Sequence, residues 1–155
     1  MTLEQELVAA LRERKQTVAV AESCTGGLLG HRLTNVPGSS AVFPGGILAY
    51  HNRPKRELLG VPAATLEQDG AVSAACAQAM ATGVRNALGA DFGIGITGVA
   101  GPGGGPPQKP SGTVFIALAT AAGVHCEQHV FPGERLTYKL QATDAALRLV
   151  LASLD

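Results

Sequence analysis

The sequence predicts an α/β fold, a three-layer α/β/α sandwich built on a mixed central sheet of about five or six strands. Segments with apolar residues at helical spacing alternate with short apolar runs rich in β-branched residues. The last two such runs meet at Ala122-Gly123, as in a hairpin, which adds an antiparallel pair to the sheet. With 155 residues, of which 46% are apolar, the chain is expected to form one domain over residues 1–155.

The first half of the chain is expected to alternate helices with strands. Leu3, Leu7 and Leu11 repeat at helical spacing, whereas TVAVA is short, apolar and β-branched. Gly45-Gly46 inside the second strand indicates a bulge or a close approach of another backbone. The expected elements are a helix over 3–14, a strand over 17–21, a helix that opens at 25–27 and ends before Pro37, a strand over 43–50 and a short helix over 54–59.

The second half contains the most irregular segment of the sequence. Residues 98–111 (GVAGPGGGPPQKPS) are many for a connection inside a compact domain, and such loops are usually functional or disordered. An Ala-rich helix before it is expected to end at Gly89. The expected elements are a helix over 71–88, a strand over 91–97, hairpin strands over 112–120 and 124–131, and a closing helix over 135–154.

Charge and composition exclude several classes of protein. Twelve basic residues balance twelve acidic ones and Trp is absent, so direct nucleic-acid binding is not expected. No run approaches the about 18 apolar residues of a membrane span, and the acidic N-terminus does not resemble a secretory signal. Three separated cysteines without a CxxC pair argue against a disulfide framework or structural zinc. We therefore expect a cytoplasmic protein that needs no metal or other cofactor.

The first candidate site is the segment 21–27 (AESCTGG), where a strand is expected to end and a helix to begin. Open α/β sheets bind ligands beyond the carboxyl ends of their strands, and a helix start offers free N–H groups. Ser23 stands where a nucleophile would sit, and the N–H groups after it could hold an oxyanion. From these residues alone three interpretations stay open: a helix N-cap, an anion-binding turn and a nucleophile.

A serine nucleophile needs a base, and the segment 50–56 (YHNRPKR) offers one. Tyr50 and Lys55 follow the expected end of the second strand, so neighbouring parallel strands would bring Lys55 close to Ser23. A solvated turn with three basic residues is the alternative interpretation. The thiol of Cys24 is a second candidate nucleophile, although an unpaired cysteine is more often a small buried residue.

Residues 93–98 (GIGITG) match the GxGxxG pattern of dinucleotide-binding proteins. The glycines lie inside an expected strand and a Gly/Pro coil follows in place of a helix, so we reject the dinucleotide interpretation. The glycines of 98–105 could instead present several N–H groups to an anion, or form a flexible tip.

His125, Glu127 and His129 share one face of an expected strand, as in a two-His, one-carboxylate metal site. Ligands at i, i+2 and i+4 of a strand span about 13 Å, which is too far for one ion. We therefore interpret this polar face as the solvent side of an edge strand whose other face is apolar. Arg135, at the expected start of the last helix, could bind a phosphate or carboxylate, or form an exposed salt bridge.

Together, five segments resemble the CinA C-terminal domain family, which includes bacterial nicotinamide-nucleotide amidases. Each segment alone is a weak signal, but their common order along nearly the whole chain is specific. The matching segments are AESCTGG at 21–27, Gly45-Gly46 with YxNxxK at 50–55, GITGVAGPGG at 95–104, KPxGTV at 109–114 and FxGxR at 131–135.

The resemblance implies hydrolysis of the carboxamide of nicotinamide mononucleotide to nicotinate mononucleotide and ammonia, a step of pyridine nucleotide recycling. It implies acyl transfer without a metal, in which Ser23 resembles the nucleophile and Lys55 its base. Tyr50 and Thr97 resemble groups that orient the reacting atoms. The residues implied to bind the nucleotide substrate are Thr25, Gly26, Gly45, Gly46, Gly98, Gly101, Gly103 and Arg135.

Two positions depart from the family pattern. Lys139 stands where an arginine is frequent, and residues 105–108 (GPPQ) lack the usual Thr and acidic residue. The resemblance also implies a homodimer or a larger homo-oligomer. In many relatives the domain follows a larger N-terminal domain, so the chain is expected to be a stand-alone amidase or a separated part. A second function stays open: a non-catalytic nucleotide-binding module linked to competence or DNA damage.

Overall fold

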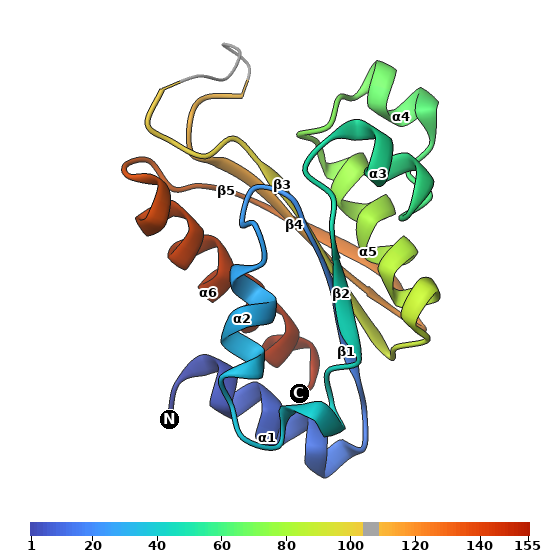
Figure 1. The fold of residues 1–155 in the computed structure, drawn as a ribbon, viewed down its shortest axis with the longest axis vertical. Helices are drawn as coiled ribbons and strands as arrows, with labels where there is room; N and C mark the ends of the chain where they lie inside the picture. Colours follow the sequence, from blue (N-terminus) through green and yellow to red (C-terminus); the bar gives the residue numbers. More distant parts are fainter. Residues whose placement is uncertain (104–108) are drawn as a thin grey trace.

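The computed structural model describes residues 1–103 and 109–155, and its centre is one mixed five-stranded sheet with the strand order β2-β1-β3-β4-β5. β1 pairs in parallel with β2 and β3, whereas β4 runs antiparallel to both β3 and β5. The predicted α/β sandwich with a mixed sheet is confirmed (Figure 1). The strands are β1 Val18–Glu22, β2 Gly45–Leu48, β3 Phe92–Gly98, β4 Thr113–Thr120 and β5 Gly123–Val130.

Helices cover both faces of the sheet (Figure 1). One face carries α1, α2 and α6, and the other carries α3, α4 and α5. The predicted helices are present, but α4 was missed because none of its residues is buried and it has no apolar period. Within the described residues, no helix combines the length and apolar character needed to cross a bilayer. The helices are α1 Leu3–Arg14, α2 Leu28–Thr34, α3 Asn52–Glu57, α4 Ala63–Gln68, α5 Ala74–Leu88 and α6 Arg135–Ser153, with a short 3-10 turn at Ser39–Ala41.

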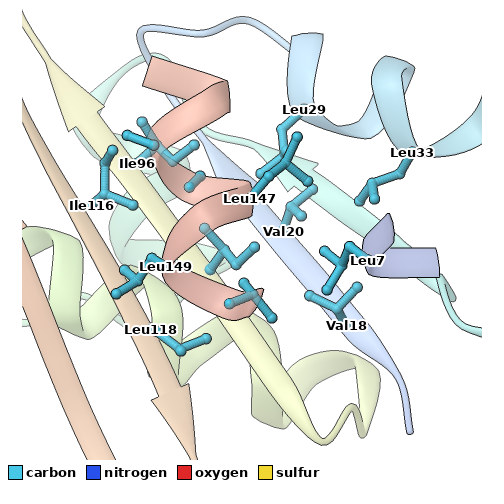
Figure 2. Packing of buried hydrophobic residues seen from close by; sticks show 14 of the residues in the cluster. Leu7, Val18, Val20, Leu29, Leu33, Ile96, Ile116, Leu118, Leu147 and Leu149 are labelled. Atoms are coloured by element: carbon cyan, nitrogen blue, oxygen red, sulfur yellow. The ribbon is translucent and has the colours of Figure 1, made fainter. Parts of the chain in front are cut away.

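The face under α1, α2 and α6 is packed by large aliphatic side chains. Leu7, Leu29 and Leu147 come from the three helices and are fully buried. They meet Val20 and Ile96, which β1 and β3 direct to the same side (Figure 2). This layer is the main hydrophobic core, and it fixes β1 and α2 next to each other.

The face under α5 is packed by close backbone approach. A Cβ added at Gly93 or Gly95 of β3 would collide with the α5 carbonyl oxygens of Ala81 and Ala77. The three glycines of the GxGxxG pattern therefore belong to β3. Gly93 and Gly95 allow α5 to pack closely against the strand. β2 is shorter than expected, and its Gly46 lets the carbonyl of Val20 approach.

The last strand, β5, forms one edge of the sheet, as predicted. Its apolar face is not covered, because Val124 is 42% exposed and Val130 is 51% exposed. Only Cys126, between them, packs against the residues under α5. The edge strand is therefore open to solvent on both faces.

Candidate active site

Two residues with reactive side chains meet at the carboxyl ends of β1 and β2. Ser23 directly follows β1, and its N–H donates to the carbonyl of Ile96 in β3 at 3.1 Å. The alternation of side chains along β1 turns Ala21 and Ser23 toward the α5 face. Lys55 lies in α3, the helix that follows β2, and its side chain reaches back to Ser23. Adjacent parallel strands thus bring together residues that are 32 positions apart.

The amine of Lys55 has three polar neighbours. Its Nζ lies 3.0 Å from Ser23 Oγ, 2.9 Å from the carbonyl oxygen of Ala49 and 3.3 Å from that of Tyr50. A carbonyl can only accept, so the two N–H bonds of a neutral amine point to Ala49 and Tyr50. The remaining lone pair then faces the hydroxyl of Ser23, which is the orientation that a base requires.

Burial favours the neutral form of this amine. Lys55 is only 1% exposed, and this burial lowers its pKa, although the thiols of Cys76 and Cys24 act in the opposite direction. No salt bridge joins Lys55 to a carboxylate of the described residues. The site therefore has a hydroxyl beside an amine that can accept its proton.

The turn after Ser23 presents backbone N–H groups. Gly26 and Gly27 adopt positive φ values of 61° and 99°, and the N–H of Gly26 folds back to the carbonyl of Ser23. Within the described part of the chain, the N–H groups of Cys24 and Thr25 donate no hydrogen bond. These two groups are free to hold an oxyanion that forms at a carbon attached to Ser23 Oγ.

Ser23 and Lys55 line a cavity of about 280 Å³. Tyr50, Thr97 and Arg135 also line it, as do Gly98 at the end of β3 and Gly103 in the segment that follows. The hydroxyl of Thr97 donates to the carbonyl of Ala71 at 2.7 Å and so fixes the opposite wall. Tyr50 is 65% exposed at the rim, and its carbonyl, not its phenol, contacts the amine of Lys55.

Other residues implied by the resemblance lie outside the lining of this cavity. The hydroxyl of Thr25 donates to Glu22, and Gly26 forms part of the turn. Gly45 and Gly46 pair with Ala19 and Val20 inside the sheet, and Gly101 packs against the carbonyl of Gly133. Gly104 and Gly105, which also belong to the expected anion-binding loop, lie outside the described residues.

Cys24 also lines this cavity, but its side chain packs in the layer under α1, α2 and α6. It is buried, and this burial raises the pKa of its thiol to about 11, so a thiolate nucleophile is not favoured. The phenol of Tyr138 in α6 donates to its sulfur at 3.1 Å. Cys24 thus attaches the turn to α6, a contact that local sequence patterns do not reveal.

The histidines of β5 lie on a different part of the sheet. Glu127 Oε1 is 3.1 Å from His129 Nε2, while Glu127 Oε2 is 4.0 Å from His125 Nε2. Among residues 1–103 and 109–155, no group of three or more His, Cys, Asp or Glu side chains is arranged to hold a metal ion. His125, Glu127 and His129 therefore form a polar surface cluster on the edge strand β5.

Sequence reasoning did not single out Glu22, the buried acidic residue next to Ser23. Its carboxylate is 1% exposed and accepts hydrogen bonds from Thr25, Leu29 and Gly30. The signal was present in the motif AESCTGG, because an acidic residue at the buried end of a strand needs donors nearby.

Known proteins resemble this chain in both sequence and fold. The model of the CinA C-terminal domain matches residues 1–154. A CinA-like protein of Chlorobaculum tepidum is 50% identical over 159 residues, which cover 99% of this chain and 38% of that protein. The chain therefore spans well under half of that relative's length.

Solved structures agree with this comparison. A CinA superfamily protein of Klebsiella pneumoniae superposes with a TM-score of 0.95 at 35% identity, covering 98% of this chain and 95% of the other. The competence/damage inducible protein CihA of Agrobacterium tumefaciens gives a TM-score of 0.93 at 38% identity, with 97% and 92% covered.

Proposed function

Because this chain belongs to the CinA C-terminal domain family, we propose that it is a serine amidohydrolase acting on nicotinamide mononucleotide. The products would be nicotinate mononucleotide and ammonia. The observation that carries the proposal is the 3.0 Å contact between Lys55 Nζ and Ser23 Oγ, made by a buried amine whose other neighbours are carbonyls. A lysine in such a setting is a suitable base for a serine nucleophile.

The proposed reaction is acyl transfer in two halves. Ser23 Oγ attacks the carboxamide carbon while its proton passes to Lys55 Nζ, and the N–H groups of Cys24 and Thr25 stabilise the oxyanion. The C–N bond then breaks, Lys55 returns the proton to the leaving nitrogen, and ammonia departs. A water molecule then gives a proton to the same amine and attacks the Ser23 ester; as the C–O bond to Ser23 breaks, Lys55 returns that proton to Ser23 Oγ and the carboxylate leaves.

Substrate binding would use the open side of the cavity. A volume of about 280 Å³ suits the pyridine carboxamide rather than a whole mononucleotide. Arg135 lines the cavity from the first turn of α6, and Lys139, one turn later, lies close to Gly26. These two cations would hold the phosphate outside the cavity while the amide reaches Ser23.

The experiment that tests this function measures ammonia released from nicotinamide mononucleotide by the purified chain. We expect Ser23→Ala to lower turnover by about 10³-fold or more, because the nucleophile is lost. Ser39→Ala is the matched control, since Ser39 has the same 7% exposure as Ser23 but lies in the 3-10 turn before β2. Equal turnover by Ser23→Ala and the unaltered chain would reject the serine mechanism.

The second candidate is the nucleotide-binding module without catalysis. The similar protein CihA is named a competence/damage inducible protein, a name that specifies no reaction. Calorimetric binding of nicotinamide mononucleotide without ammonia release would favour this candidate over the amidase. The homo-oligomeric state is a further proposal, which light scattering of the same sample tests.

A further inference from the structure

Glu22 and Ser23 are consecutive residues at the end of β1, and their side chains point into opposite layers. Val18 and Val20 of β1 belong to the layer under α2 and α6, so Glu22 faces that layer, while Ser23 faces α5. Glu22 is 1% exposed although it is not joined by a salt bridge to any described residue. A buried carboxylate is costly unless donors surround it, so its partners indicate why it is there.

Three donors surround the carboxylate of Glu22. Oε1 accepts from the hydroxyl of Thr25 at 2.6 Å and from the N–H of Leu29 at 3.0 Å. Oε2 accepts from the N–H of Gly30 at 3.0 Å. The carboxylate therefore holds both ends of the turn that contains Gly26 and Gly27.

Among the described residues, no other side chain accepts hydrogen bonds from the first turn of α2. Gly27 occupies the position before α2 where a capping side chain normally sits, and it has none. The amides of Cys24 and Thr25 lie in the same turn and are the groups available to an oxyanion. Two glycines with positive φ make this turn intrinsically adaptable, so an external restraint is needed to keep the amides in register.

We propose that Glu22 is a positioning residue that fixes the oxyanion-binding turn through Thr25 and the first turn of α2. This inference rests on the proposed function for its reaction, but not on the identity of the substrate. It assigns Glu22 no contact with substrate and no proton transfer. Its effect should fall on the rates of acylation and deacylation, because each half of the reaction builds an oxyanion at the acyl carbon.

The test compares Glu22→Gln and Thr25→Val with a matched carboxylate variant, Glu4→Gln. Glu4 is also a hydrogen-bonded carboxylate of this layer, but it pairs with Arg32 away from the cavity. We expect Glu22→Gln to lower kcat about 10- to 100-fold with KM within twofold, since a transition-state interaction is weakened. Thr25→Val should give a similar loss, and the double variant should be no worse than Glu22→Gln alone.

The acylation step is followed separately with p-nitrophenyl acetate, which transfers its acetyl group to Ser23 Oγ and releases p-nitrophenolate. The burst rate should fall by the same factor as kcat in Glu22→Gln and stay within twofold of the unaltered rate in Glu4→Gln. The pH at which the burst rate is half-maximal should be unchanged in both variants, because Lys55 is not affected. The Ser23→Ala variant gives the background rate of p-nitrophenolate release.

The outcomes separate the two proposals. If the unaltered chain releases no ammonia but shows the burst, and Glu22→Gln slows it, the amidase function fails and the positioning role stands. A burst rate in Glu22→Gln equal to that of the unaltered chain overturns the positioning role. If Glu22→Gln does not fold, Thr25→Val decides, because it removes one hydroxyl and leaves the carboxylate with two backbone donors. A chain whose burst does not exceed that of Ser23→Ala overturns both proposals.

Discussion

Glu22 and Lys55 are two buried ionisable residues on opposite sides of the same strand end, and their surroundings differ in kind. Each is 1% exposed, and no described residue forms a salt bridge with either. Glu22 is surrounded by N–H and O–H donors, whereas Lys55 is surrounded by carbonyl acceptors and one hydroxyl. The α2 side therefore holds a carboxylate among donors, and the α5 side holds an amine among acceptors, as the two proposed roles require.

The side chains that pack behind the two residues also differ in size. Behind Glu22, large aliphatic side chains such as Leu29 and Val20 fill the space between α2 and the sheet (Figure 2). Behind Lys55, glycines and alanines bring α5 and the sheet close together. Lys55 is buried on this side, and its burial lowers the pKa of its amine.

The largest expected effect comes from replacing the amine with an apolar chain of similar length. Lys55→Met should lower ammonia release about 10²- to 10⁴-fold, the usual contribution of a general base. Its free energy of unfolding should stay equal or increase, because a buried amine no longer has to be desolvated. Glu22→Met is the contrast: it leaves two N–H groups and a hydroxyl without acceptors and should lower stability by about 1–3 kcal/mol. Urea unfolding measures the stability of both variants. Normal turnover by Lys55→Met would refute the assignment of Lys55 as the base.

The second prediction concerns the pH dependence of turnover. Lys55 must be neutral to accept the proton, so kcat should rise about tenfold per pH unit below the pKa of Lys55 and level off above it. Burial lowers that pKa, which shifts the rise to a lower pH than an exposed lysine would give. The unfolded chain binds the proton more tightly, so the contribution of Lys55 to stability increases with pH until its unfolded pKa is passed.

Stopped-flow measurements of turnover across a range of pH locate the pH at which kcat is half-maximal. The difference in unfolding free energy between the unaltered chain and Lys55→Met, measured over the same range, isolates the contribution of Lys55. A flat kcat profile below neutral pH would contradict a lysine base.

The fold and the Ser23–Lys55 pairing followed from sequence because both depend on local periodicity and on where parallel strands end. Alternating elements predicted adjacent strands, and adjacency brought residue 55 beside residue 23. The motif AESCTGG indicates that a buried Glu22 needs donors nearby, but a strand pattern does not show that Thr25 and the first turn of α2 supply them. Gly45 and Gly46 were assigned to substrate binding by resemblance, yet they lie within β2, where Gly46 admits the carbonyl of Val20.

The third prediction tests the difference in packing with two helical glycines. A Cβ at Gly83 of α5 would collide with the carbonyl of Leu59, so Gly83→Ala should lower the free energy of unfolding by about 1–3 kcal/mol. A Cβ at Gly30 of α2 would lie 3.6 Å from its nearest neighbours, which is ordinary contact. Gly30→Ala should therefore raise stability by about 0.5–1 kcal/mol through helix propensity. Equal shifts in the urea midpoint for the two variants would contradict the proposed difference between the layers.

The smallest effect is expected at Glu4, a carboxylate that belongs to the α2 side but not to the site. Its hydrogen bonds with Arg32 lower its pKa to about 2, and Arg32 also pairs with Asp144, so that α1, α2 and α6 are tied together. Because the folded pKa lies below the unfolded value of 4.5, this contribution is fully present above pH 4.5 and is lost as the pH falls toward 2.

At neutral pH, Glu4→Gln should lower the free energy of unfolding by about 0.2–1 kcal/mol, since the pair is partly exposed. The difference in unfolding free energy between Glu4→Gln and the unaltered chain should disappear at acid pH. Turnover should stay unchanged, because Glu4 restrains the layer and Glu22 restrains the turn. A loss of turnover in Glu4→Gln as large as in Glu22→Gln would mean that the whole layer, rather than one carboxylate, positions Ser23.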